Sequence, residues 1–351
     1  MRTRLRPSLD WLLVLAPIAI VLEVVAAPDL AIFLVSALGI VPLAGLIGRS
    51  TEQLALHVGP RLGGLINATF GNVTELIISI FLILEGRIAI VKTSLTGSIL
   101  GNLLLVLGMS FLIGGIRHEE QEYSARAAIV HSTSLVLAVA GLLMPAVFAL
   151  GEHRPLIERE VVSGTVAAVL IVLYLAALAF TLVTHEHLFR TPGEREAPTW
   201  SRLAAVVTLL IATILVAVLS ELLVSSLEPA IDALGISEGF VGLIVIPIIG
   251  NAAEHSSAVL FAIRNQVDVT LEIAIGSSTQ IALFVAPALV FVSLLVGHPM
   301  DFVFSTFEVA AVAVSTFLVF MISVDGRSNW LEGAQLVGAY AIMAISFYFV
   351  Q

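Results

Sequence analysis

Two short segments of the chain are near copies of each other, Gly71-Asn72-Val73-Thr74-Glu75 and Gly250-Asn251-Ala252-Ala253-Glu254, and each lies in the middle of a long apolar stretch. Each segment places a carboxylate where a bilayer is expected. An ionisable side chain at membrane depth costs roughly 2.5–3.5 kcal/mol on insertion scales, so it is interpreted first as part of an ion or proton pathway. The offset of 179 residues between Glu75 and Glu254 suggests a duplicated site.

The composition predicts an all-α polytopic membrane protein. Hydrophobic residues make up 59% of the 351 residues, charged residues only 12%, and the mean hydropathy is +1.07. A helix needs about 20 predominantly apolar residues to cross roughly 30 Å of hydrocarbon. We find eleven runs near this length, at residues 11–27, 30–48, 62–84, 89–116, 126–149, 160–184, 202–227, 238–263, 270–297, 302–323 and 333–350.

Charge, cysteine content and one missing motif exclude several classes of protein. The formal net charge of −10 argues against a nucleic-acid partner. The chain has no cysteine, so it has no disulfide framework and no thiol chemistry. It also lacks the His-Glu-x-x-His motif of a zinc hydrolase, and we expect a protein that is not an enzyme and needs no cofactor.

The distribution of basic residues predicts the orientation of the chain in the bilayer. With the N-terminus in the cytoplasm, 12 of the 16 basic residues fall on the cytoplasmic side, and only Arg87, Lys92, Arg154 and Arg159 on the other. The positive-inside rule therefore favours a cytoplasmic N-terminus and, with an odd number of spans, a C-terminus outside. The short linker, the lack of a long N-terminal extension and the absence of cysteine favour a prokaryotic cell (inner) membrane over a vacuole.

The chain divides into two similar halves around a polar connection. We expect a cytoplasmic stub with an extra helix at residues 1–29, a first five-helix repeat at 30–184, a cytoplasmic linker at 185–201 and a second five-helix repeat at 202–351. Gly97-Ser98 matches Gly276-Ser277 at the same offset of 179, while Thr51-Glu52 matches Ser220-Glu221 at 169. Because each half holds an odd number of spans, the second half enters the membrane with opposite polarity, as in an inverted-topology repeat.

The neighbours of the two glutamates predict a site for a hard cation. Both glutamates lie near mid-depth of their spans, and the preceding glycines weaken the helix so that carbonyl groups can turn toward a cavity. Asn72 and Asn251 add amide oxygens three residues before the acids. Such oxygen ligands suit calcium, with 6 to 8 ligands at about 2.3–2.6 Å, better than a soft transition metal. Further candidates for a cation or proton site are Ser98, Asn102, Ser277 and Gln280.

Structural readings of the same residues remain open. Asn72 and Asn251 are also typical of helix-packing hydrogen bonds, and Ser98 and Ser277 of close helix contact. Glu52 and Glu221 fit either solvated membrane surfaces or a role in proton coupling or gating. His255, beside Glu254, fits either a packed, hydrogen-bonding position or a response to pH near neutrality that takes part in proton coupling or gating.

The motifs resemble those of the calcium/proton exchanger family of the calcium/cation antiporter superfamily. The resemblance covers nearly the whole chain and rests on four segments: Asn67 to Ile77, Gly250 to His255, Leu95-Thr96-Gly97-Ser98, and Gly276-Ser277-Ser278-Thr279-Gln280. It implies eleven helices, one extra N-terminal helix and two inverted five-helix repeats, with calcium bound between the motifs at mid-membrane. Glu75 and Glu254 are the principal metal ligands that it implies. The linker at 185–201 is short and mixed in charge, unlike the acidic segment of many eukaryotic relatives.

The expected function is a secondary active antiporter that exports cytosolic Ca²⁺ in exchange for H⁺. Two facing carboxylates in a low-dielectric cavity cannot both stay ionised without a cation, so calcium and protons compete for one site. Its partners are then Ca²⁺, H⁺ and the lipid bilayer, and association into a homo-oligomer is left open. A sodium-coupled cation/Ca²⁺ exchanger is the nearer alternative, and a passive cation channel the more distant one.

Overall fold

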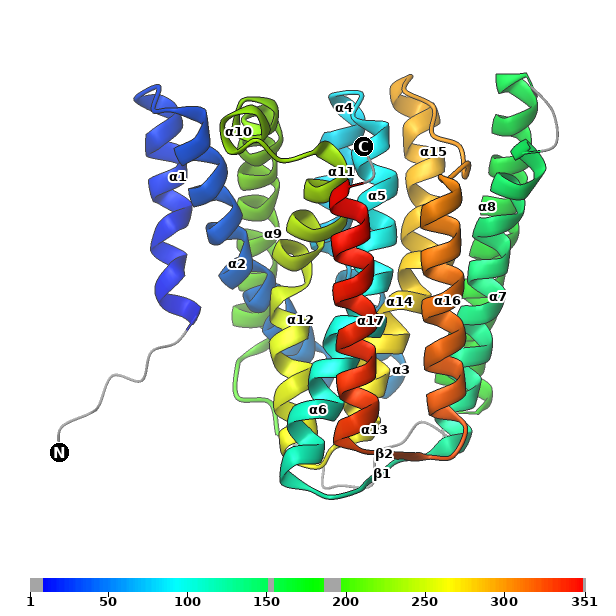
Figure 1. Cartoon of the computed structure of the whole chain (residues 1–351). Coiled ribbons are helices and arrows are strands. Elements are labelled where there is room, and N and C mark those ends of the chain that lie inside the picture. The colour runs from blue at the N-terminus through cyan, green and yellow to red at the C-terminus, as the bar shows by residue number, and fades with distance from the viewer. Residues whose placement is uncertain (1–8, 151–154, 186–196, 350–351) are drawn as a thin grey trace, which may run out of the picture.

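A computed structural model describes residues 9–150, 155–185 and 197–349. Nearly all of them form helices that run between two ends of the molecule (Figure 1). The α-helices are α1 Leu15–Val24, α2 Asp29–Val58, α3 Pro60–Phe70, α4 Val73–Leu84, α5 Ile88–Leu100, α6 Leu107–Arg117, α7 Ala125–Leu150, α8 Leu156–Ala179, α9 Arg202–Ser225, α10 Leu227–Leu234, α11 Glu238–Phe240, α12 Ile246–Ile263, α13 Val267–Leu271, α14 Ser277–Gln280, α15 Ala286–Val296, α16 Thr306–Ser323 and α17 Trp330–Phe349.

Shorter elements connect or extend these helices. A 3₁₀-helix, η1 Leu9–Val14, precedes α1. The wide turns of π-helices occur at η2 Gly101–Val106, η3 Phe180–Thr184, η5 Val241–Val245, η6 Glu272–Gly276 and η7 Ile281–Val285. Two strands of two residues each, β1 Gln121–Glu122 and β2 Arg327–Ser328, pair at one end of the molecule, called the β end below (Figure 1).

The described residues contain nine helical runs that are long and apolar enough to cross a membrane. These runs correspond to nine of the eleven predicted spans, in agreement with the predicted all-α membrane fold. The first predicted span corresponds to η1 and α1, and the third to α3 and α4. The connections at residues 118–124 and 324–329, both predicted to be cytoplasmic, lie together at the β end (Figure 1). Residues 1–8, 151–154 and most of the linker, 186–196, lie outside the described residues.

The third predicted span is not continuous, and the prediction of one helix over 62–84 was wrong. The helix ends at Gly71, the C-cap of α3, and restarts after Asn72, the N-cap of α4. Asn72 is therefore outside a regular helix, and its side chain is engaged by the opposite half of the chain instead. Such a break suits this position because glycine stabilises a helix poorly.

The second copy of the motif lies in an unbroken helix. Gly250 and Asn251 are inside α12, and the irregular backbone lies one turn earlier, in η5, just before Pro247. Proline has no N–H to continue the α-helical pattern, so a wider turn before it is expected. The helix is therefore interrupted at Gly71, as expected, but it is not interrupted at Gly250.

Close backbone approach joins α5 of the first half to η5 of the second. A Cβ atom on Gly97 would overlap the backbone carbonyl of Leu243, and one on Gly242 would overlap Thr93. Small residues at helix contacts of membrane proteins allow this approach, which maximises van der Waals packing. Gly97 is therefore required by packing, one residue before Ser98.

Replacement of Gly97 by alanine is expected to destabilise the fold by about 1–3 kcal/mol, because the methyl group forces α5 and η5 apart. Thermal unfolding of the purified protein in detergent measures the effect as a lower midpoint. Gly101→Ala is the matched control, since a Cβ atom there meets nothing within 4 Å. Equal midpoints for the two variants would contradict this packing role.

The strand pair connects the two halves of the chain at the β end. Gln121 pairs with Ser328 and Glu122 with Arg327, in antiparallel register. The Arg327 guanidinium lies 3.2 Å from Glu120 and 3.4 Å from Glu122, and the Tyr123 hydroxyl donates to the carbonyl of Ile322 at 3.1 Å. Burial, reinforced by the nearby Asp325, raises the pKa of Tyr123 above its ordinary value, so the phenol stays a neutral donor. The α6–α7 and α16–α17 connections are thereby held together.

Candidate cation site

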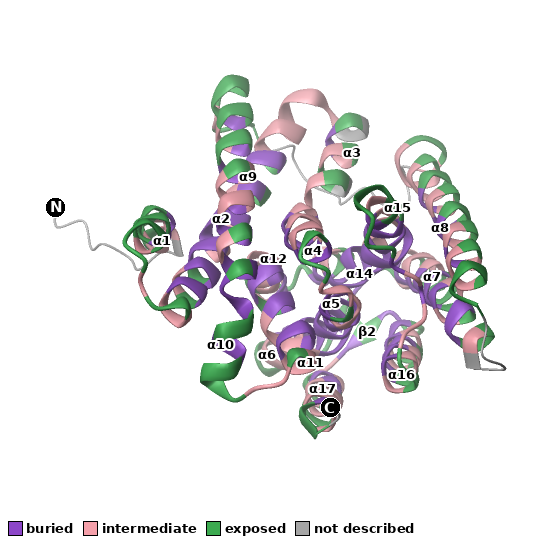
Figure 2. Ribbon diagram, turned by 90° about the horizontal axis from the view of Figure 1, so that it is seen from above, coloured by how far each residue is buried: buried purple, intermediate pink, exposed green. Residues whose placement is uncertain are grey.

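The two glutamates meet at the centre of the helix bundle, where α4, α5, α12 and α14 lie close together (Figure 2). Glu75, on the first turn of α4, is only 3% exposed. Glu254 lies on α12, and the two carboxylates are near enough for their charges to interact. The structure therefore brings together two acids that are 179 residues apart in the sequence.

Each glycine of the duplicated motif lies against the glutamate of the other half. A Cβ atom on Gly250 would be 3.2 Å from Cδ and Oε1 of Glu75. A Cβ atom on Gly71 would be 3.7 Å from Oε1 of Glu254. At Gly250 the absence of a side chain leaves space for the Glu75 carboxylate. At Gly71 a Cβ atom would be in ordinary contact with Glu254 and would instead crowd the Asn67 carbonyl, at 2.8 Å. Sequence reasoning missed this contact, although the identical position of glycine in both motifs was a signal for it.

The asparagines and serines form crossed hydrogen bonds between the halves. The Ser277 hydroxyl donates to Oδ1 of Asn72 at 2.9 Å, and Nδ2 of Asn251 donates to the Ser98 hydroxyl at 3.3 Å. All four side chains are buried. Each half thus supplies an asparagine that the serine of the other half orients.

The two asparagines nevertheless differ in what they leave free. Nδ2 of Asn72 donates to Oε1 of Gln280 at 2.9 Å, so both ends of this amide are engaged. Nδ2 of Asn251 donates to the carbonyl of Pro247 as well as to Ser98, while its Oδ1 has no hydrogen-bond partner among the described residues. The prediction treated the two asparagines alike, whereas the structure makes only the Asn251 oxygen available.

Four buried oxygens at the centre have no hydrogen-bond partner within the described part of the chain: both carboxylate oxygens of Glu75, Oε2 of Glu254 and Oδ1 of Asn251. Buried polar atoms are rarely left without partners, so these oxygens fit a ligand that accepts electron pairs. Two carboxylates and an amide oxygen are the ligands that a hard divalent cation prefers. Within the described residues, no group of three or more histidine, aspartate or glutamate side chains could hold a metal.

The remaining predicted residues fall at different distances from this centre. Nε2 of His255 lies 3.2 Å from Oδ1 of Asn102. This contact holds the two side chains in place beside the site. Glu52 and Glu221 are exposed, and the structure does not bring them to the centre. Glu52 lies on the last part of α2 and Glu221 on the last part of α9. Their suggested role in proton coupling or gating stays a prediction.

Sequence reasoning passed over a Gly-x-Ser-x-Gly pattern at Gly235 to Gly239, which in hydrolases carries a nucleophile on a strand-to-helix turn. Here Ser237 follows a helix instead. Its hydroxyl caps α11 by accepting a hydrogen bond from the backbone N–H of Phe240 at 3.1 Å. Ser237 therefore has a structural role that accounts for the pattern.

Comparison with known proteins agrees with this geometry. The family described as sodium/calcium exchanger protein matches residues 29–183 and 204–349. A Ca²⁺/H⁺ antiporter of Aphanothece halophytica is 42% identical over 96% of this chain and 95% of its own. The Ca²⁺/H⁺ antiporter ChaA of Bacillus subtilis is 43% identical over 95% of this chain and 96% of its own. The solved structure of native YfkE, 40% identical, covers 97% of this chain and 99% of its own with a TM-score of 0.86.

The fold, the paired acids and these comparisons define an integral membrane protein that is a secondary transporter and not an enzyme. The chain belongs to the sodium/calcium exchanger protein family. The resemblance to its calcium/proton exchanger branch, inferred from the motifs, is confirmed.

Proposed function

We propose that the protein exchanges Ca²⁺ for H⁺ across a membrane, and that Glu75 and Glu254 bind both ions in turn. The observation that carries the proposal is the pair of carboxylates that come together from opposite halves, Glu75 buried and Glu254 partly buried, with oxygens that have no partner among the described residues. The names of the relatives, Ca²⁺/H⁺ antiporters at 42% and 43% identity, support the same pair of substrates.

The mechanism follows from the cost of burying two negative charges side by side. None of the ion pairs of the described residues includes Glu75 or Glu254. Two such carboxylates need either a divalent cation or protons to reduce their charge. Calcium binding then displaces the protons, and proton binding releases calcium. If the site can switch from one side of the membrane to the other only when calcium or protons neutralise the carboxylates, transport of one ion is coupled to transport of the other in the opposite direction.

Each neighbouring residue has a part in this proposed site. Oδ1 of Asn251 adds a neutral oxygen to the carboxylates, and Ser98 holds the asparagine by its amide nitrogen. Gly250 leaves the space in which the Glu75 carboxylate lies. We infer that the halves are inverted repeats, which the crossed contacts support. A single chain supplies both acids, so the mechanism needs no oligomer.

The direction of transport depends on the orientation in the membrane, which we infer from the positions of the basic residues. An N-terminus in the cytoplasm of a prokaryotic cell places the β end inside. An inward proton gradient across such a membrane drives calcium outward. The bacterial origin of the Bacillus subtilis relative is consistent with this assignment.

A flux experiment on the purified protein in proteoliposomes tests the proposal. A proton gradient is expected to drive saturable calcium transport in the opposite direction, and a sodium gradient at fixed pH is expected to drive none. Calcium transport driven by sodium alone would favour a sodium-coupled exchanger. A calcium current without proton movement would favour a passive channel.

A further inference from the structure

Gln280 is one of the side chains in which the two halves of the cation site differ. At the sequence offset of 179 that relates the two motifs, Gln280 corresponds to Gly101, which has no side chain. Gln280 is the hydrogen-bond acceptor that engages Nδ2 of Asn72 at 2.9 Å. Asn251, whose half-site has glycine at the equivalent position, keeps its oxygen free of partners among the described residues.

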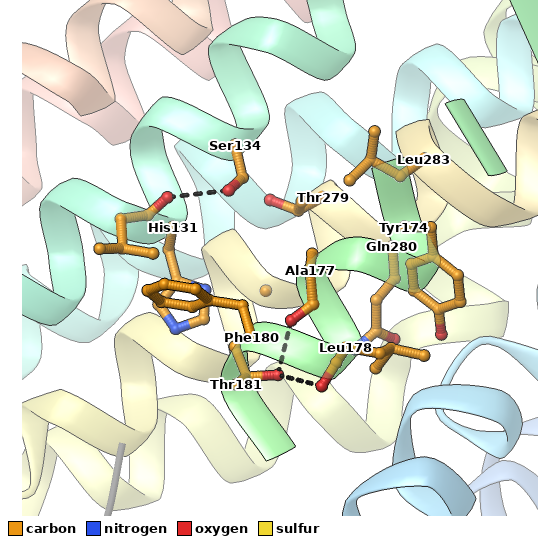
Figure 3. A pocket seen from close by; sticks show the side chains of 12 residues that line it. His131, Ser134, Tyr174, Ala177, Leu178, Phe180, Thr181, Thr279, Gln280 and Leu283 are labelled. Atoms are coloured by element: carbon orange, nitrogen blue, oxygen red, sulfur yellow. Dashed lines mark hydrogen bonds between the residues drawn. The ribbon is translucent and has the colours of Figure 1, made fainter. Parts of the chain in front are cut away.

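Gln280 also lies in the wall of a cavity. This side cavity, about 310 Å³ in volume, lies between α7, α8 and α14 (Figure 3). Gln280 and Tyr174 both line it, with Thr181, Ser134 and Thr279 around the same space. Protein interiors are close-packed, and a buried side chain can change its rotamer only where such space exists.

The cavity can satisfy a carboxamide that moves into it. The hydroxyls of Ser134, Thr181 and Thr279 donate to the carbonyls of Val130, Ala177 and Ile275 at 3.0, 3.0 and 2.8 Å. Their oxygens keep lone pairs that can accept hydrogen bonds from the Gln280 amide. A rotated Gln280 therefore loses the Asn72 amide that donates to its Oε1 and gains acceptors for its Nε2 amide, which offset part of that loss.

We propose that Gln280 is a positioning residue that holds Asn72 away from the ion in the calcium-free protein and withdraws into the side cavity when calcium binds. Release of Nδ2 lets the Asn72 amide rotate, so that its oxygen leaves the Ser277 hydroxyl and turns to the ion, while Oδ1 of Asn251 is already without such a partner among the described residues. The inference rests on the proposed calcium site and adds a coupled movement to it. Gln280 acts through Asn72, and the cavity gives it room to do so.

Calcium titration of the purified full-length protein in detergent at one pH tests this role. Gln280→Ala is expected to bind calcium roughly fivefold more tightly, because binding no longer breaks the Asn72–Gln280 hydrogen bond. Ala177→Leu, which fills the side cavity from α8, is expected to weaken binding several-fold. Ala176→Leu is its matched control, since Ala176 is exposed on the same helix and does not line the cavity.

A double variant that combines Gln280→Ala with Ala177→Leu distinguishes a positioning role of Gln280 from a general effect on the structure. In the Gln280→Ala background, Ala177→Leu is expected to have no further effect on calcium binding, because no side chain remains to withdraw. If Ala177→Leu does not fold, Ser134→Leu fills the same cavity from α7. The inference is overturned, and the proposed function is not, if Gln280→Ala binds calcium more weakly or as tightly as the unmodified protein. Equal effects of Ala177→Leu in both backgrounds would have the same meaning. Absence of calcium binding by the unmodified protein overturns the proposed function together with it.

Discussion

Replacement of either Glu75 or Glu254 by glutamine is expected to reduce calcium–proton exchange by at least about a hundredfold. Glutamine keeps the size of the side chain but removes one of the two charges that hold the ion. Loss of one partner from a buried charged group costs about 3–5 kcal/mol, which corresponds to roughly two to four orders of magnitude in binding. Calcium uptake into proteoliposomes under an imposed pH gradient measures the change.

Glu85→Gln is the matched control for Glu75→Gln. Glu85 is the C-cap of the same helix, α4, and is exposed at the end of the molecule away from the β end (Figure 1). This control is expected to exchange calcium at the unmodified rate. Substantial exchange by Glu75→Gln or Glu254→Gln would exclude the paired carboxylates as the site of ion binding.

The second large effect is expected from the smallest possible change at the site, Gly250→Ala. Its methyl group would lie 3.2 Å from Cδ and Oε1 of Glu75, closer than an ordinary van der Waals contact. We expect the displaced carboxylate to lower the exchange rate by about tenfold or more, since small misplacements at a binding centre have large effects. Gly250 is inside α12, where alanine favours the helix by about 0.5–1 kcal/mol, so the fold is expected to stay stable.

Two measurements together make this expectation specific. Thermal unfolding in detergent should give an unchanged or higher midpoint for Gly250→Ala, while proton-driven calcium transport falls. Gly164→Ala on α8 is the control, because a Cβ atom there meets nothing within 4 Å. A Gly250→Ala protein that is stable and fully active would show that the Glu75 carboxylate does not need the space that a side chain at position 250 would fill.

The helical organisation was predictable because membrane spans follow from hydropathy and length alone. The prediction was wrong where a helix stops inside an apolar run, at Gly71 and Asn72, because hydropathy does not report a backbone break. Most of the π-helical turns were also not predictable, because the residues in them are mostly apolar, as in the surrounding helices. At η5 the following Pro247 was a signal.

The residues that come together at the candidate site were easier to predict than the difference between its two halves. The repeated motif identified Glu75, Glu254 and the two asparagines, and the structure brings them to one place. The different states of Asn72 and Asn251 depend on Gln280, which reaches Asn72 from 208 positions away in the chain. Alignment of Gln280 with Gly101 at the offset of the motifs could have indicated the difference. The side cavity, which depends on how α7 and α8 pack, has no such signal.

The strand pair at the β end has a mechanical consequence for transport. Its backbone pairing connects the loop between α6 and α7 to the loop between α16 and α17, and in the bundle α6 packs against α17 and α7 against α16. These four helices, two from each half, are therefore joined at the β end. We expect helices outside this group to carry any motion that uncovers the site on that side, with the four joined helices as the fixed reference.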